Sequence, residues 1–437
     1  MYIAVITDIH CHLTTNTLEN DLMKNKTTPL LARSLFIASV ATVALIPTIQ
    51  PVFAKTMVVN QTMQEPTTMN SIKQIAQQNP KIEVVFVLDT TGSMSGLIQA
   101  AKEKIWSIAS TLATGQASNK NTPDIKMGLV AYRDRGDAYI TKTTPLSTDL
   151  DSMYSTLMDY KAGGGGDSPE SVNKGLYDAV HKMLWSQDES TYKVIFLIGD
   201  APAHMDYQND VKYPTTIAKA LNKGIIINAI QSGQNRKTTT NWQQIATLGQ
   251  GDYFQVDNSG NAVAIATPFD KKLAELSVEL DNTRVYYGNK RVQLKQRKKV
   301  AASNKLHSES SVKSLARRAA YNTSASGKSN FLGEGELVDA ISSGATSLAH
   351  IDKNELPKAM QAMKPEAQKQ YVLGKAKKRK ALKKHIRQLT EKRDSFLKKE
   401  VAKTGADKNS FDAQIFGAIR EQAAKKGLLY DEADAKY

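Results

Sequence analysis

Apolar segments at residues 81–280 predict an α/β fold, in which a doubly wound and mostly parallel sheet carries helices on both faces. Continuous apolar runs, such as the one at 84–88, are typical of strands buried on both sides, as in parallel sheets. Between these runs, apolar residues recur at helical spacing, so strands and helices alternate along the chain. A basic, mainly α-helical region is expected to follow.

The boundaries of each element in the α/β domain are placed where turn residues occur or where the spacing of apolar residues changes. Strands are predicted at 82–88, 126–132, 139–141, 193–198, 225–230 and 253–256. Helices are predicted at 95–113, 150–160, 169–185, 213–222, 242–247 and 261–280. Pro169 suits the first position of the third helix, where its missing N–H group costs nothing.

The region after residue 285 supplies most of the formal net charge of +15. Residues 281–330 are basic and rich in Ser, Ala and Lys, which predicts a flexible connector. Residues 331–437 are expected to be helical and partly coiled-coil-like, with a heptad-like seam at Leu382, Ile386, Leu389 and Phe396. An amphipathic helix is predicted at 410–426, with its apolar face formed by Phe411, Ile415, Ala418 and Ile419.

The first 80 residues predict export of the protein. Lys24, Lys26 and Arg33 precede an apolar run, and Ala54 ends a small-residue cleavage site, which is the layout of a secretory signal peptide at 23–54. Residues 1–22 are expected to be an upstream extension from a wrongly assigned start, and residues 55–80 a polar linker. The expected destination is the periplasm or the medium of a bacterium. The single cysteine, Cys11, lies in the extension, so the mature chain is expected to form no disulfide.

Oxygen-bearing side chains at three separate places suggest a metal site. Asp89, Thr91 and Ser93 follow the first predicted strand at alternate positions, Asp200 follows the strand at 193–198, and Glu170 lies in a Gly-rich loop between them. In open α/β sheets, ligands bind beyond the carboxyl ends of the strands, where these side chains would meet. Such oxygens suit Mg²⁺, Ca²⁺ or Mn²⁺. Taken alone, the first motif fits equally well an acidic turn with a helix cap.

The stretch from about 82 to 256 resembles the von Willebrand factor type A domain. Asp-x-Thr-x-Ser at 89–93 is similar to the metal-ion-dependent adhesion site of that family, with Thr91 where the usual motif has Ser. Asp-Ser-Pro-Glu at 167–170 resembles the corresponding loop of integrin β I-like domains, where many other members have Thr. The resemblance makes Glu170 a direct ligand and Asp200 a ligand often reached through water. Asp167 would serve an adjacent cation or shape the loop.

The resemblance implies recognition of a partner protein through an exposed carboxylate that replaces a water on the cation, Mg²⁺ above all. Glu170 adds a negative charge beside the ion, which favours metal retention and weakens the attraction for an incoming acid. The five side chains complete the shell of one ion and leave no evident base and nucleophile, so no enzyme is expected. Metal-assisted hydrolysis, with Glu170 or Asp200 as base, is the less favoured alternative.

The basic helices allow more than one interpretation. They are either a solvated helical hairpin or a surface for an anionic envelope polymer or lipid headgroups. Nucleic acid is not expected, because the protein is exported and aromatic residues that would stack on bases are scarce. The runner-up function is accordingly a structural envelope protein that is attached through these helices, with a metal that only stabilises the fold.

Overall fold

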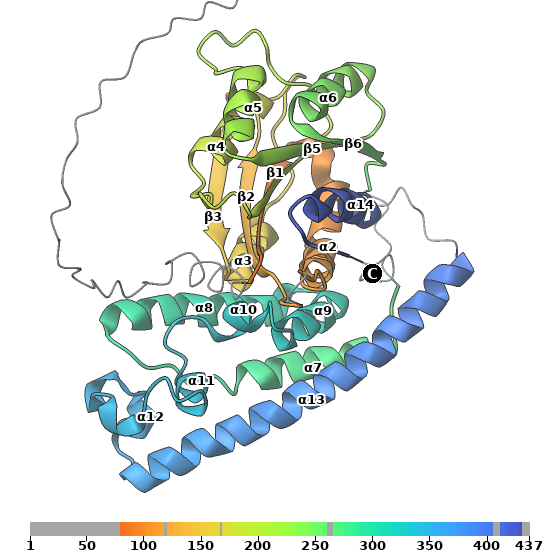
Figure 1. Ribbon diagram of the computed structural model, residues 1–437. Helices are drawn as coiled ribbons and strands as arrows, with labels where there is room; N and C mark the ends of the chain where they lie inside the picture. The colour runs from red at the N-terminus through yellow and green to blue at the C-terminus, as the bar shows by residue number, and fades with distance from the viewer. Residues whose placement is uncertain (1–78, 118–119, 167, 260–264, 405–410, 431–437) are drawn as a thin grey trace, which may run out of the picture. The chain divides into compact units, whose positions relative to one another are not determined.

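The computed structural model describes residues 79–117, 120–166, 168–259, 265–404 and 411–430 (Figure 1). The predicted signal peptide and upstream extension, and nearly all of the polar linker, lie outside these ranges. Within them, no helix has both the length and the hydropathy that a membrane span requires.

A six-stranded sheet forms the centre of the α/β domain, with the strand order β3-β2-β1-β4-β5-β6. Four neighbouring pairs are parallel and only β2 and β3 are antiparallel, which confirms the predicted mostly parallel sheet. Its strands are β1 (Lys81–Asp89), β2 (Asp124–Tyr132), β3 (Thr141–Ser147), β4 (Tyr192–Gly199), β5 (Ile225–Ser232) and β6 (Gln250–Val256).

The strand order reverses at β1, which lies between β2 on one side and β4 on the other. Both β1 and β4 are buried over nearly their whole length, as their continuous apolar sequences predict. The connections leave a reversal point of this kind in opposite directions, which opens a crevice at the carboxyl ends of the strands. The predicted site residues follow β1 and β4 there.

Helices cover the two faces of the sheet, as the labels in Figure 1 show. Val84 and Phe86 of β1 belong to a core with residues of α2 and α3, whereas Val85 and Val87 belong to a second core with residues of α4, α5 and α6. The alternation follows from the two-residue period of a strand. The helices are α2 (Ser95–Leu112), α3 (Leu150–Asp159), α4 (Val172–His181), α5 (Tyr213–Asn222) and α6 (Arg236–Leu248).

Pro169 does not begin a helix, contrary to the sequence prediction. The chain is extended at Glu170, which forms an isolated parallel bridge with Ala203, and α4 starts only at Val172. The Ser168–Pro169 peptide bond is cis. Pairing of this loop with the segment after β4 therefore delays the start of the helix.

Helices also form most of the remaining chain. They are α7 (Asp270–Asp281), α8 (Lys290–Glu309), α9 (Val312–Thr323), α10 (Lys328–Leu332), α11 (Leu337–Ser342), α12 (Lys358–Gln361), α13 (Pro365–Thr404) and α14 (Phe411–Ala424). Short 3₁₀ turns occur as η1 (Gly92–Met94), η2 (Leu348–His350) and η3 (Lys353–Glu355).

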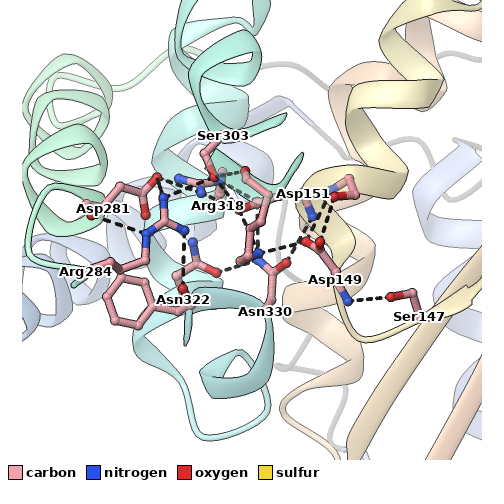
Figure 2. Close-up of polar contacts among 12 residues, drawn as sticks. Ser147, Asp149, Asp151, Asp281, Arg284, Ser303, Arg318, Asn322 and Asn330 are labelled. Carbon is pink, nitrogen blue, oxygen red and sulfur yellow. Dashed lines mark hydrogen bonds and ion pairs between the residues drawn. The ribbon is translucent and has the colours of Figure 1, made fainter. Parts of the chain in front are cut away.

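Residues 281–330, expected as a flexible connector, instead contain α8, α9 and α10. Helix α8 packs against α3, and α9 packs against α2 and α7. Their low apolar content is offset by polar side chains that reach into the α/β domain. Figure 2 shows this network, in which Ser303 of α8 and Arg318 of α9 contact Asp151 of α3.

The predicted seam of α13 packs within the chain. Leu382 and Ile386 are buried with residues of α7 and α9, and Leu389 is partly buried beside them. Helix α14 buries its predicted apolar face in the sheet core, and its Gln422 accepts a hydrogen bond from the Tyr192 hydroxyl of β4 (2.9 Å). The last described helix therefore packs against the α/β domain.

Candidate metal centre

The turn after β1 gathers one carboxylate and two hydroxyls. Asp89, the last residue of β1, has no solvent exposure. Its Oδ1 atom accepts hydrogen bonds from the Thr91 backbone N–H (2.8 Å) and from the Thr91 hydroxyl (2.6 Å). The Thr91 and Ser93 hydroxyl oxygens lie 3.5 Å apart, with Thr91 buried and Ser93 exposed. The three side chains of the first motif are therefore brought together, open to solvent on the Ser93 side.

The second oxygen of Asp89 has no partner. Its Oδ2 atom is buried and has no hydrogen bond of good geometry among the described residues, although the Tyr132 hydroxyl, which is also unpaired, lies nearby. The Asp89 carboxylate lies beside Gly199 at the end of β4, where a Cβ atom would be 3.1 Å from Oδ2 and 2.4 Å from the Tyr132 hydroxyl. Glycine is therefore required there for β4 to approach the Asp89 carboxylate. A buried carboxylate oxygen without a partner is costly, and a bound cation would satisfy it.

The Gly-rich loop places a second carboxylate near the first motif. Gly165 has φ +77°, a left-handed conformation that glycine adopts readily. A Cβ atom at Gly165 would lie 3.0 Å from Thr91 Cβ and 3.1 Å from Glu170 Oε1. The loop backbone thus passes close to both side chains, which puts Glu170 near the turn after β1.

Glu170 is held by its backbone and leaves a carboxylate oxygen unpaired. Its N–H donates to the Pro202 carbonyl (2.9 Å), and its own carbonyl accepts from the His204 N–H (3.1 Å). The residue is 3% exposed, and Oε2 has no hydrogen-bond partner among the described residues. Two orphaned carboxylate oxygens, on Asp89 and Glu170, therefore belong to the same end of the sheet.

Asp200 follows β4 but is less closely tied to the other four residues. Its side chain is partly exposed and forms no hydrogen bond with a described residue, while its backbone carbonyl accepts from the Thr238 hydroxyl (2.9 Å). Its charge does contribute to the raised pKa values of Asp89 and Glu170. In the described part of the chain, no three His, Cys, Asp or Glu side chains are clustered closely enough to hold an ion.

Burial opposes ionisation of both orphaned carboxyl groups. Desolvation raises the pKa of Asp89 to about 7, and the charge of Asp200 adds to the rise while the hydrogen bonds from Thr91 counter it. Desolvation likewise raises the pKa of Glu170 to about 9, reinforced by Asp89 and further carboxylates. Positive charge at this place would favour the ionised forms. The chemistry of these donors thus fits a divalent cation: Asp89, Thr91 and Ser93 lie together, Glu170 lies on the other side of Gly165 from Thr91, and Asp200 follows the neighbouring strand.

Asp137 supports the site in a way that sequence reasoning missed. Its carboxylate accepts from the Gly165 N–H at 3.2 and 3.0 Å, and so holds the Gly-rich loop in place. Asp137 belongs to the loop after β2, where Arg135 pairs with Asp210 (2.7 Å). No local pattern signals the contact, because 28 residues separate Asp137 from Gly165 along the chain. Asp167, the other acid of the Gly-rich loop, lies outside the described residues.

A buried network beside the site engages His204. The Asp134 carboxylate accepts from the hydroxyls of Ser171 (2.9 Å) and Tyr207 (2.8 Å), and His204 Nε2 lies 3.4 Å from it. His204 Nδ1 is 2.7 Å from Asp206. Both ring nitrogens of His204 thus face carboxylates of this network, which connects the loops after β2 and β4.

Comparison with known proteins gives one family match. Residues 83–267 match the family described as von Willebrand factor A domain. A relative, the alpha-protein kinase vwkA of Dictyostelium discoideum, is 29% identical over 124 residues, which are 28% of this chain and 19% of the relative. The chain therefore spans about a fifth of that relative's length.

Solved structures with detectable likeness include proximal thread matrix protein 1 from the mussel byssus, with a zinc-occupied MIDAS motif. It is 16% identical, with a TM-score of 0.31, over 41% of this chain and 42% of that chain. Another is the pilus adhesin SpaC from Lactobacillus rhamnosus GG. It is 15% identical, with a TM-score of 0.30, over 41% of this chain and 29% of that chain.

Proposed function

We propose that the von Willebrand factor A domain at residues 83–267 binds a divalent cation, Mg²⁺ foremost, and through it an exposed carboxylate of a partner protein. Asp89, Thr91, Ser93, Glu170 and Asp200 would hold the ion. The observation that carries the proposal is the pair of buried, unpaired oxygens, Asp89 Oδ2 and Glu170 Oε2, near two hydroxyls at one end of the sheet.

The mixture of donors explains why binding of a partner acid is proposed. The Thr91 and Ser93 hydroxyls supply dipoles without adding negative charge, so the carboxylates only partly neutralise a bound cation. Ser93 is exposed, which leaves this side of the site accessible to a partner. The nearby Glu170 would strengthen metal retention and lower the affinity for the partner acid.

We further propose a role in recognition rather than catalysis, in the periplasm or outside the cell of a bacterium. The secretory pattern at 23–54 supports the location. Metal-assisted hydrolysis with Glu170 or Asp200 as base is the alternative. Turnover of ester or phosphate substrates that disappears with Asp89→Ala would favour that alternative over binding.

The metal is tested first, by titrating Mg²⁺ or Mn²⁺ into chelator-treated full chain in a calorimeter. We expect one ion per chain, with binding lost in Asp89→Ala and in Glu170→Ala. Glu275→Gln is the matched control, since it removes an exposed carboxylate of α7 whose partner among the described residues is Lys272. Unchanged binding in Asp89→Ala would refute the site.

Partner recognition is tested separately, on a resin that carries an acidic peptide. We expect retention that needs Mg²⁺ and is lost in chelator, whereas a resin carrying the amidated peptide should retain nothing. Retention that persists in chelator would contradict the proposal that the cation bridges to the partner. It would point instead to the basic helices as the attachment surface.

A further inference from the structure

We propose that a groove between α11 and α13 binds a linear polyanion that carries phosphate groups. The two helices pack against each other (Figure 1), and the groove along them has a volume of about 900 Å³. This site is separate from the metal centre and does not depend on it. Its lining includes Asp339 of α11 and, from α13, Lys377, Lys380, Lys383, Lys384 and Arg387.

The cations of the groove lie along one stripe of α13. Lys380, Lys384 and Arg387 are spaced by four and three residues, so they recur on one face of the helix at steps of about 6 and about 4.5 Å along its axis. From Lys380 to Arg387 the stripe spans about 10 Å. A row of positive charges suits an extended chain of anionic groups better than a single small anion.

These cations lack the carboxylate partners that the buried arginines of the helical region possess. Arg379 pairs with Glu336 (2.7 Å), and Arg393 pairs with Asp270 (2.6 Å). By contrast, no described residue forms a hydrogen bond or ion pair with Lys380, Lys383, Lys384 or Arg387. The helical region therefore pairs its buried arginines and leaves these groove cations without an ion pair among the described residues, although Asp339 and Glu391 also line the groove.

Lys383 is a groove cation that is partly shielded from water. Its Nζ atom lies 5.0 Å from the centre of the buried Phe331 ring, which Arg379 also faces at 5.1 Å. Burial and the neighbouring Arg379 and Arg387 together lower the pKa of Lys383 to about 8. Asp339 opposes this decrease, and it also pairs with Lys328 (3.2 Å). An anion in the groove would relieve the repulsion.

The shape and composition of the groove favour a phosphate chain over other polyanions. It is a recess between two helices whose cations Lys380, Lys384 and Arg387 are exposed, so an extended chain of phosphates can reach all three. No aromatic side chain belongs to its described lining, so the stacking by which proteins hold unpaired bases is missing. The groove then recognises only the phosphate charges of the polyanion, and release of counterions from the polyanion contributes to the affinity.

The test measures binding of short-chain inorganic polyphosphate to the full chain in chelator, at several salt concentrations. We expect binding that weakens with salt. In Lys380→Gln/Lys384→Gln/Arg387→Gln it should fall about tenfold or more, with a smaller salt slope. The control Lys392→Gln/Lys398→Gln/Lys399→Gln removes the same charge from exposed positions of α13 outside the groove, and should change affinity by less than about twofold.

Equal losses in the two triple variants would overturn the proposal, because binding would then follow net charge alone. Two further probes separate the sources of phosphate. Orthophosphate that binds as tightly as polyphosphate, or phosphatidylglycerol vesicles that bind while polyphosphate does not, would also overturn it. As a local readout, polyphosphate should protect Lys383, but not Lys398, from an amine-reactive label at pH 8, and protection of both or neither counts against the groove.

Discussion

Asp151 of α3 and Arg318 of α9 form a two-point ion pair in which neither side chain is exposed to solvent. Arg318 Nε donates to Asp151 Oδ1 (2.7 Å) and Arg318 Nη2 to Asp151 Oδ2 (2.6 Å), as Figure 2 shows. Asp281 of α7 lies 2.8 Å from the same guanidinium. The buried charge of Arg318 is therefore paired only when α3, α7 and α9 are all in place. The folding of α7 and α9 thus depends on that of the α/β domain.

Asp151→Asn should lower the free energy of unfolding by about 3–5 kcal/mol, because it leaves part of the Arg318 charge uncompensated in the interior. Urea denaturation followed by circular dichroism measures the change. Lys81→Met is the control, since Lys81 and its partner Asp188 are both more than a third exposed, and such pairs contribute about 0–1 kcal/mol. A loss in Asp151→Asn no larger than in the control would contradict the coupling.

The same pair should make stability sensitive to acid. Burial alone would raise the pKa of Asp151, but Arg318 and Lys299 outweigh it and hold this pKa well below its usual range. A carboxyl group with a lowered pKa stabilises the fold above its unfolded value of about 3.9, and the contribution fades as the pH falls further. The wild type should thus lose stability below about pH 4 more steeply than Asp151→Asn. Parallel slopes would show that other carboxylates dominate.

Without metal, the candidate site at Asp89 and Glu170 should make the fold less stable as the pH rises, which is the opposite of the effect of Asp151. The pKa values of about 7 for Asp89 and about 9 for Glu170 lie above their ordinary values of about 4, so the native state binds more protons than the unfolded state from about pH 4 to about pH 9. In chelator, stability should therefore fall as the pH rises from about 5 to 9. Saturating Mg²⁺ should flatten the fall, as should Glu170→Gln without metal. If neither Mg²⁺ nor Glu170→Gln changed the slope of stability against pH, this account would be contradicted.

Gly165→Ala should impair metal binding. Gly165 has φ +77°, and a Cβ atom at this position would be crowded, at 3.0 Å from Thr91 Cβ and 3.1 Å from Glu170 Oε1. The left-handed conformation alone costs about 1–2 kcal/mol for a residue with a side chain. Calorimetric Mg²⁺ titration and urea denaturation measure the two effects. Gly166→Ala is the matched control, because a Cβ there meets no atom within 4 Å, and equal effects of both changes would refute the packing argument.

Much of the α/β domain follows from local sequence. The runs at β1 and β4 are apolar at successive positions, a pattern typical of strands that are buried on both faces. The turn after β1 is similarly local, since Thr91 donates to Asp89 over two residues. For the same reason the apolar faces of α13 and α14 were apparent, because helical spacing alone defines them.

The strand and helix pattern of the α/β domain thus follows from the order of apolar and polar residues along the chain. Three arrangements instead arise on folding: Asp137 holds Gly165, Glu170 pairs with Ala203 ahead of α4, and α8 and α9 pack on the α/β domain. They depend on polar groups that find partners across long stretches of chain. Burial makes each such partner obligatory, but no periodicity in the sequence records which one is chosen.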